Sequence, residues 1–351
     1  MSNPFSLSFG MEPKEYITRP QQINKIIDSF SDESPSSYLF MLSGVRGAGK
    51  TVMLSNITET FEKKKDWIVI NISPDMDILN SIAAHLYSRK SLQNLFIDAK
   101  IDLSALGIGI SLKNSTPVFD ITTALEKLFD ELKKKNYKVL IAIDEIVNNE
   151  NVKLFSGVYQ ILLRKKYPIF LLMTGLYENI NNLQNEKTLT FLYRAPKIYL
   201  EPLNLFSIAR SYRKVFNLND DTAKTMANLT NGYAYAYQVL GYLYWENIYQ
   251  NKKGKKPEDL IDEYDEMLSE YVYEKIWHEL PEKEKQILSL LVINGEMKNK
   301  DIRSNLSLTD SQMSVYRDRL KRRGLIDVSK YGYLSLILPR FDQIARFWVD
   351  Q

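Results

Sequence analysis

Apolar residues follow two alternating patterns over residues 1–203. Four short runs are almost wholly apolar, as expected of strands buried on both faces of a parallel sheet: residues 38–42, 67–72, 139–143 and 169–173. A last short strand is predicted at residues 197–200. Between these runs, apolar residues recur at helical spacing in residues 23–30, 53–61, 76–87 and 120–135. Such alternation predicts an α/β domain with helices on both faces of a parallel sheet.

The alternation stops after residue 203. Residues 205–272 read as helices with breaks at residues 217–220, 231–232 and 251–257, which predicts an all-α lid. Three further helical stretches and two short strands, at residues 325–328 and 333–338, follow in the order of a winged-helix domain. We therefore expect a core at residues 1–203, a lid at residues 204–278 and a winged helix at residues 279–351.

Two segments of the predicted core stand outside this alternation. Residues 1–20 contain three prolines and no long periodic pattern, so we expect an arm that lies extended over the surface of the next domain. Residues 101–113, IDLSALGIGISLK, alternate apolar and polar residues on both sides of Leu106-Gly107. This pattern predicts a β-hairpin inserted at about residues 99–114.

The segment after the first strand carries the strongest chemical signal. Residues 44–51, GVRGAGKT, fit the pattern G-x-x-x-x-G-K-[ST] between a buried strand and an amphipathic helix. Three glycines let successive backbone N–H groups point at phosphate oxygens, and the start of the helix adds partial positive charge. Lys50 is expected to reach the β and γ phosphates and Thr51 to bind Mg²⁺. The predicted nucleotide-binding residues are Gly44, Val45, Arg46, Gly47, Ala48, Gly49, Lys50, Thr51 and Val52.

Polar residues at the ends of later strands are candidates for catalysis. Asp144 and Glu145 follow the strand at residues 139–143, where Asp144 would join the Mg²⁺ shell and Glu145 would polarise the attacking water. Thr174 ends the next strand, either to sense the γ-phosphate or only to terminate the strand. Arg194 precedes the last strand and either supplies positive charge to the nucleotide of a neighbouring subunit or forms a surface salt bridge.

Residues just before the first helix are candidates for the base pocket. In P-loop ATPases with this layout, the segment ahead of the first strand often walls the adenine. Ile17, Thr18 and Arg19 occupy that segment here. Simple packing of an N-terminal arm is the alternative.

Composition narrows the classes of chemistry. The chain of 351 residues has 44% hydrophobic and 25% charged residues and a net charge of +3, so any nucleic-acid surface must be local. It has no cysteine and only two histidines, which excludes disulfides, thiolate zinc sites and a His-based metal site. Neither a signal peptide nor a membrane span is apparent, so we expect a cytoplasmic protein.

The third helix of the predicted winged helix, residues 309–323, has five basic and two acidic residues. Side chains facing base edges would be Ser311, Gln312, Ser314 and Val315, and those contacting phosphates would be Arg319, Arg322 and Lys330. Winged helices also serve as protein–protein modules, and Asp318 sits awkwardly for DNA. Both possibilities stay open. In the lid, the aromatic stretch at residues 232–247 lacks Lys and Arg, which favours packing in the core or at a domain interface over nucleic-acid binding.

Taken together, these motifs resemble the AAA+ ATPases of the archaeal-type, initiator-like group, which are related to origin-recognition proteins and to the STAND signalling ATPases. The likeness is carried by NPFSLSFG at residues 3–10, GVRGAGKTVML at 44–54, TGL at 174–176, YRAPKIYLEPL at 193–203 and NGYAYAYQVLGYLYW at 231–245. It implies a five-stranded parallel sheet, a helical lid and a winged helix.

The resemblance also implies roles for particular residues. Lys50 and Thr51 would bind phosphate and Mg²⁺, Asp144 and Glu145 would be the acidic pair, Thr174 would be sensor 1, and Arg194 would stand where an arginine finger lies. The lid motif, usually glycine, any residue, proline, is Gly232-Tyr233-Ala234 here, and no arginine stands nearby as a lid sensor.

From these observations we expect a slowly hydrolysing switch that binds ATP or ADP with Mg²⁺. Its nucleotide state would set the angle between sheet domain and lid and so present the winged helix to double-stranded DNA. An alternative is a STAND-like scaffold with little turnover whose winged helix binds protein. A third possibility, a processive motor, is disfavoured because no pore-loop aromatic motif is apparent. A homo-oligomer or a protein partner is compatible with each.

Overall fold

The structure is a computed structural model that describes residues 2–8, 12–98, 101–102, 116–117, 120–187, 189–251 and 254–349. The chain divides into two compact units. The first, called here the lid unit, comprises Met1–Arg19, Gly44–Val52 and Tyr199–Gln351, and the second, the sheet unit, comprises Pro20–Ser43 and Met53–Ile198. The predicted phosphate loop thus groups with the helices that follow it much later in the chain.

A five-stranded sheet organises the sheet unit. Its strands are β1 (Leu39–Ser43), β2 (Trp67–Ile72), β5 (Lys138–Ile143), β6 (Ile169–Gly175) and β7 (Lys197–Tyr199). They lie in the order β2-β5-β6-β1-β7, and the β2–β5, β5–β6 and β6–β1 pairs are parallel. This confirms the five-stranded parallel sheet that the resemblance implied. Residues expected to end the fourth run, Thr174 and Gly175, belong to β6 itself.

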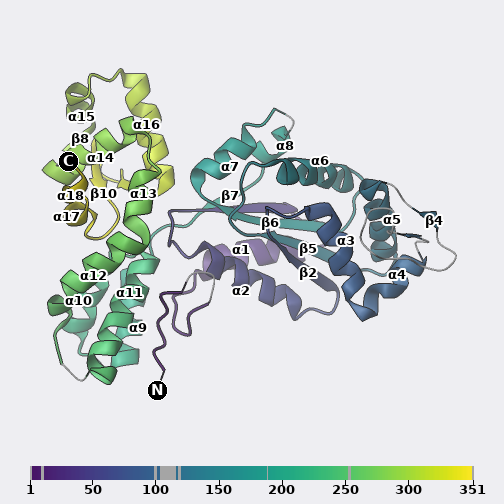
Figure 1. The fold of residues 1–351 in the computed structure, drawn as a ribbon, viewed down its shortest axis with the longest axis horizontal. Helices are drawn as coiled ribbons and strands as arrows, with labels where there is room; N and C mark the ends of the chain where they lie inside the picture. Colours follow the sequence, from purple (N-terminus) through teal and green to yellow (C-terminus); the bar gives the residue numbers. More distant parts are fainter. Residues whose placement is uncertain are drawn as a thin grey trace. The chain divides into compact units, whose positions relative to one another are not determined.

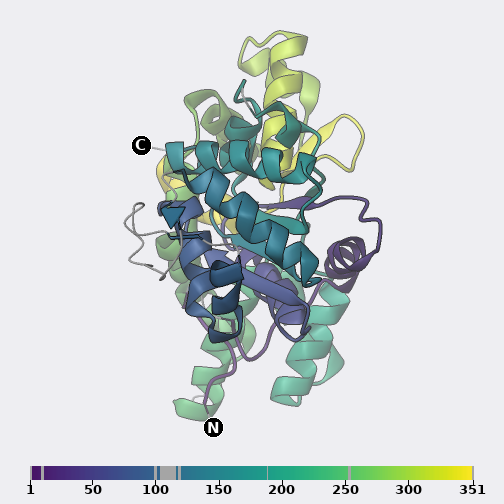
Figure 2. The same ribbon diagram turned by 90° about the vertical axis from the view of Figure 1, so that its right-hand side faces the viewer.

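Helices cover both faces of this sheet, as the continuously apolar strands require. Phe30 of α1 (Pro20–Ser31) packs against Phe40 of β1 and Phe170 of β6 on one face, where α2 (Lys50–Glu62) also lies. Leu39 and Met41 point to the other face, into a core built with α3 (Ile78–Ser88), α5 (Ile121–Lys134) and α6 (Glu150–Arg164). Figure 1 shows α3 and α6 on that face, and Figure 2 views the same layers from the side of α5.

Local capping fixes where these helices begin. The side chains of Asp77, Asp120 and Asn149 accept hydrogen bonds from backbone N–H groups in the first turns of α3, α5 and α6. The expected helix at residues 76–87 therefore starts two residues later, and Met76 stays outside it and 58% exposed. The described residues of the unit also contain the shorter helices η1 (Lys90–Leu92), α4 (Gln93–Asp98), α7 (Tyr177–Gln184) and α8 (Thr190–Tyr193).

The predicted inserted hairpin lies almost wholly outside the described residues. Two described pieces flank it, β3 (Ile101–Asp102) and β4 (Thr116–Pro117). They pair in parallel, whereas the two strands of a hairpin pair antiparallel.

Helices make up the middle of the lid unit, as expected from residues 205–272. They are α9 (Leu205–Phe216), α10 (Asp220–Thr230), α11 (Ala234–Trp245), η3 (Glu246–Gln250), η4 (Pro257–Leu260), α12 (Ile261–Leu268), η5 (Ser269–Tyr273) and α13 (Glu274–His278). Asn217 and Asn231 end α9 and α10 in the left-handed conformation, one at each predicted break. Five of the six aromatic residues singled out at residues 233–245 are buried, which confirms core packing.

The N-terminal arm does not simply lie extended over a surface. Phe5 is only 3% exposed; its ring stacks on Phe216 of α9 and packs edge-to-face against Tyr237 of α11. Gly241 of α11 makes room for the Phe5 ring, because a Cβ there would lie 2.5 Å from Phe5 Cδ1. The expectation was wrong because it depended on the prolines and on the lack of periodicity. Neither of these features predicts that one aromatic residue of the arm, Phe5, is buried.

The last part of the lid unit, residues 282–349, is called here the C-terminal module. It contains α14 (Glu282–Asn294), β8 (Met297–Lys298), α15 (Asn299–Asn305), α16 (Asp310–Arg323), β9 (Ile326–Asp327), β10 (Tyr333–Leu336), α17 (Phe341–Ile344) and α18 (Arg346–Val349). Thr309 and Gln312 form the predicted capping box of α16, and Gly324 ends that helix at φ 77°. The strands form a three-stranded antiparallel sheet, one strand more than expected.

Among the described residues, no helix is long and apolar enough to span a bilayer.

Candidate functional site: a phosphate loop held by the lid

The carboxyl ends of three neighbouring strands meet at one edge of the sheet. Ile143 at the end of β5 pairs with Met173 of β6, and Ser43 at the end of β1 pairs with Gly175 of β6. Asp144 follows β5 directly, and the phosphate loop follows Ser43 directly. Ligands of open α/β sheets bind at this edge.

Asp144, Glu145 and Thr174 form one hydrogen-bonded group in the sheet unit. The fully buried hydroxyl of Thr174 donates to Asp144 Oδ1. The backbone N–H of Glu145 also points at this group, 3.1 Å from Asp144 Oδ1 and 3.2 Å from Thr174 Oγ1. Glu145 has a left-handed backbone at φ 52°, which turns the chain after β5 and leaves its side chain exposed. Two predicted candidates are thus in contact, and the third lies beside them.

The phosphate loop has the backbone that its sequence predicts. Gly47 and Gly49 have φ of 74° and 89°, a region that residues with a Cβ rarely adopt. The buried ammonium group of Lys50 donates to the carbonyl oxygens of Gly44 at 3.1 Å and Val45 at 3.0 Å. Lys50 therefore lies folded over the loop, and Thr51 follows it in the first turn of α2.

Two tyrosines of the lid hold this loop. The hydroxyl of Tyr233 donates to the carbonyl oxygen of Arg46 at 2.5 Å, and the backbone N–H of Tyr235 donates to that of Gly47 at 3.1 Å. A Cβ on Gly47 would lie 2.8 Å from Tyr235 Cβ and would also meet the Tyr233 hydroxyl. Burial raises the pKa of Tyr233 far above its ordinary value, so the hydroxyl keeps its proton and remains a donor.

The loop also contacts the segments beyond the lid helices. Arg46 Nη2 lies 3.1 Å from Glu279 Oε1, just after α13. A Cβ on Gly324, at the end of α16, would lie 3.5 Å from the Cβ of Val45. Tyr233 and Tyr235 at the start of α11 therefore bind residues 46–47, and Gly324, which ends α16, lies near Val45. Tyr233 was expected to pack in the core or at a domain interface, and the one signal for its contact with the loop was its place directly after Gly232.

Arg19 lies beside the same loop. Its Nη2 donates to the carbonyl oxygen of Glu201 at 2.9 Å, and its Nη1 lies 3.5 Å from the position of a Cβ on Gly49. Desolvation by burial lowers its pKa to about 10, which leaves it charged at neutral pH. Ile17 packs against the lid core, and Thr18 is exposed. Of the three base-pocket candidates, Arg19 is the one placed against a loop glycine.

Arg194 is the C-cap residue of α8 and is exposed. Both roles expected for it, at the nucleotide of a neighbouring subunit and in a surface salt bridge, require a side chain that is open to solvent.

The predicted DNA contacts on and near α16 divide into two groups. Ser311, Gln312, Ser314 and Val315 are exposed. The cations form ion pairs: Arg322 with Asp318 at 2.8 Å, Arg319 with the buried Glu284 at 3.9 Å, and Lys330 with Glu296. Arg322 also donates to the hydroxyl of Tyr199 at 3.2 Å.

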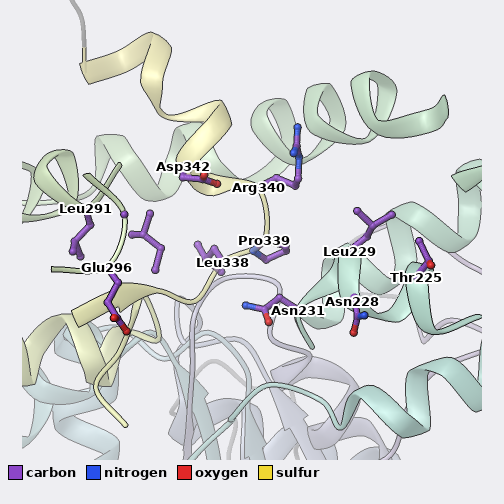
Figure 3. Close-up of a pocket in the computed structure, with 12 residues that line it drawn as sticks. Thr225, Asn228, Leu229, Asn231, Leu291, Glu296, Leu338, Pro339, Arg340 and Asp342 are labelled. Atoms are coloured by element: carbon purple, nitrogen blue, oxygen red, sulfur yellow. The ribbon is translucent and has the colours of Figure 1, made fainter. Parts of the chain in front are cut away.

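A pocket of about 530 Å³ lies between α10 and the C-terminal module. Figure 3 shows Asn228, Leu229 and Asn231 on one side and Leu338, Pro339 and Arg340 on the other. Arg340 makes a bidentate pair with Asp265, and Asn231 Nδ2 donates to the carbonyl oxygen of Ile337 at 2.7 Å. These bonds join the lid to the C-terminal module. No sequence pattern predicts them.

Comparisons with known proteins agree with this geometry. Residues 19–175 match the KAP family P-loop domain, and residues 270–344 match a domain of unknown function, DUF8462. In the comparison with curated protein sequences, no protein matches.

Solved structures with a similar fold match along almost the whole chain. The Aeropyrum pernix ORC2 protein in its ADPNP–ADP complexes has a TM-score of 0.58 at 16% identity, over 98% of this chain and 96% of that one. Its ADP form has a TM-score of 0.54 at 15% identity, with the same coverage. Cdc6p from Pyrobaculum aerophilum has a TM-score of 0.49 at 17% identity, over 98% and 97%. Residues 19–175 therefore resemble a P-loop domain of the KAP family, and the fold of the chain is similar to that of the Aeropyrum pernix ORC2 protein.

Proposed function

We propose that this chain is an ATP-dependent switch, in which a nucleotide bound at residues 44–52 changes the contacts between the phosphate loop and the lid. One observation carries this proposal: lid residues Tyr233 and Tyr235 bind the backbone of Arg46 and Gly47 directly. The N–H groups of the loop bind a phosphate group only when the loop backbone points them toward it. Any adjustment of that backbone therefore acts on the start of α11.

The loop residues fit a triphosphate. The positive φ values of Gly47 and Gly49 and the buried ammonium of Lys50 are the features that a phosphate loop needs. When phosphate enters, Lys50 exchanges its carbonyl partners for phosphate oxygens. Arg19 adds a desolvated cation beside Gly49, so we assign it to the phosphates rather than to the adenine.

The acidic group at the sheet edge fits a divalent cation. Thr51 and Asp144 offer the hydroxyl and carboxylate oxygens that Mg²⁺ prefers, and bound Mg²⁺ would neutralise charge on the phosphates. Glu145, exposed and adjacent, is the group that would accept a proton from the attacking water. The hydroxyl of Thr174 orients Asp144 through its hydrogen bond. The similar ORC2 protein was solved with ADPNP and ADP, which supports an adenine nucleotide as the ligand.

Hydrolysis is tested by substituting the proposed base. Glu145→Gln keeps the size of the side chain and removes its basicity, so ATP turnover should fall about 100-fold or more while ATP binding persists. Phosphate release and binding of a fluorescent ATP analogue measure the two quantities. Glu150→Gln, an exposed change at the start of α6, is the matched control. Turnover that Glu145→Gln leaves unchanged removes Glu145 from this role.

For the output of the switch, we propose that the C-terminal module is a winged helix that binds double-stranded DNA. Its third helix, α16, exposes Ser311, Gln312 and Ser314 at its N-terminal end and carries the basic residues of its last turn. Nucleotide state would reach α16 through Val45, which lies near Gly324 at the end of that helix.

A second candidate output is a protein partner, as in a scaffold with little turnover. The ion pairs of Arg319, Arg322 and Lys330 favour it, because each cation must leave a carboxylate before it binds a phosphate. The two outputs differ in salt dependence. If α16 reads DNA, Arg322→Ala should lower duplex affinity and reduce the slope of log affinity against log salt by about one. Fluorescence anisotropy measures both, with the exposed Arg346→Ala as control. An unchanged slope favours the protein partner.

A further inference from the structure

Helices α9 and α10 of the lid present a positively charged groove that the proposed switch does not use. Arg210, Arg213 and Lys214 lie on the exposed side of α9, which has no acidic residue, and Lys224 lies on α10. Arg213 pairs with Asp220 at 2.7 Å. Within the described part of the chain, no carboxylate is paired with Arg210, Lys214 or Lys224. We call Phe206, Arg210, Arg213, Lys214 and Lys224 the basic face.

The floor of this groove is apolar. The groove has a volume of about 850 Å³. Besides the cations, it is lined by the apolar Leu205, Ala209, Leu218, Ala223 and Ala227 and by the polar Asn217, Asp220 and Asn228. Phe206 is 75% exposed and lies under the guanidinium of Arg210, 6.0 Å from ring centroid to Cζ. An apolar floor bordered by cations is the complement of an amphipathic helix with acidic residues.

The same unit carries a helical segment whose exposed side is acidic, while its apolar side is buried in the lid core. Residues 257–274 contain eight acidic residues and no Lys or Arg: Glu258, Asp259, Asp262, Glu263, Asp265, Glu266, Glu270 and Glu274. Asp262, Glu266, Glu270 and Glu274 are exposed at four-residue spacing along α12, η5 and α13, which follow one another without a break. Tyr271 is 44% exposed next to Glu270. We call these five residues the acidic face.

We infer that the basic face of one chain binds the acidic face of a second copy, so that the protein assembles head to tail through its lids. Charge complementarity sets the partner: the four cations meet the four carboxylates, and Tyr271 supplies an aromatic ring to the apolar floor. Because the two faces are different surfaces, one such contact leaves one basic face and one acidic face free. Two copies can close as a two-fold dimer if both contacts form at once, and otherwise the contact builds rings or open chains.

One observation favours a protein surface over a nucleic acid in the groove. The apolar floor offers phosphates nothing to bind, whereas it suits the side chains of a helix.

The test is a reciprocal charge reversal on the full chain. The basic-face variant carries Arg210→Glu and Lys214→Glu, and the acidic-face variant carries Glu266→Lys and Glu270→Lys. A third variant carries all four changes, and Lys63→Glu with Lys65→Glu is a control of the same charge change on exposed residues of the sheet unit. Sedimentation velocity gives the mass of each variant at about 50 mM and about 500 mM salt. The higher salt concentration weakens contacts between exposed charges. Circular dichroism confirms that each variant is folded.

The inference predicts that the wild type and the control form assemblies at low salt. The mass of these assemblies should fall at high salt. Each two-residue variant alone should bind itself at least about tenfold more weakly, because like charges then face each other. A mixture of the two, and the four-residue variant, should assemble again. A wild type that stays monomeric at low salt overturns the inference, as does a mixture that remains monomeric. So does loss of DNA binding in the basic-face variant with unchanged mass, which would assign the groove to nucleic acid.

Discussion

At the scale of single residues, the phosphate loop requires glycine at two positions, 47 and 49. Gly47 and Gly49 were predicted from the loop motif, and both have the positive φ that only glycine adopts without strain. Tyr233 was missed as a loop contact because tyrosine is not specific to such a role. An aromatic residue in an apolar stretch is most simply interpreted as a packing residue. The hydrogen bond from its hydroxyl to the carbonyl oxygen of Arg46 becomes apparent only in the structure.

Arg19 gives a prediction at this scale. Because burial lowers its pKa to about 10, keeping its charge is unfavourable in the folded chain, and an anionic ligand offsets this cost. Arg19→Gln should weaken ATP binding about tenfold, the usual loss for one hydrogen bond to a charged group, and should weaken AMP binding far less. Isothermal titration calorimetry with AMP, ADP and ATP measures the series, with Arg346→Gln as control. Equal losses for all three nucleotides would instead assign Arg19 to the adenosine.

At the scale of elements, periodicity predicted the strands within one or two residues, because a run buried on both faces is apolar at every position. Helix α6 was not predicted, although Asn149 caps it and six of its residues are buried. Strand β8 was also missed, since two residues are too few for any pattern. The arm was misplaced because the burial of Phe5 depends on Phe216 and Tyr237, which lie more than 200 positions away in sequence.

An ion pair between elements of the C-terminal module gives a second prediction. Glu284 of α14 is fully buried, and its Oε2 lies 3.1 Å from Nε of Arg323 in α16. Glu284→Gln removes the counter-charge of a guanidinium that is only 12% exposed. The free energy of unfolding of the module should fall by about 3–5 kcal/mol, as for other broken buried pairs.

Thermal unfolding followed by circular dichroism measures the loss. Glu282→Gln, on the same helix but exposed, is the matched control and should leave the midpoint unchanged. If Glu284→Gln unfolds at the temperature of the wild type, the pair does not anchor α16.

At the scale of the whole molecule, the sequence predicted the α/β fold but not how its parts are grouped. Linear order placed the phosphate loop in a core at residues 1–203. By contacts, residues 44–52 group with the arm and with residues 199–351. The reason is a set of bonds between residues far apart in sequence, from Arg46 to Tyr233 and Glu279. Local periodicity carries no information about such bonds, and they are the basis of the proposed switch.

Hydrogen exchange at the start of α11 tests the central claim most directly. The N–H of Tyr235 donates to the carbonyl oxygen of Gly47, so its exchange reports whether the loop holds the lid. Adding Mg²⁺-ATP should change exchange in residues 232–238 of the wild type and should leave it unchanged in Lys50→Ala, which cannot hold the phosphates. The account is contradicted if ATP binds and this segment does not respond, or if the chain does not bind ATP.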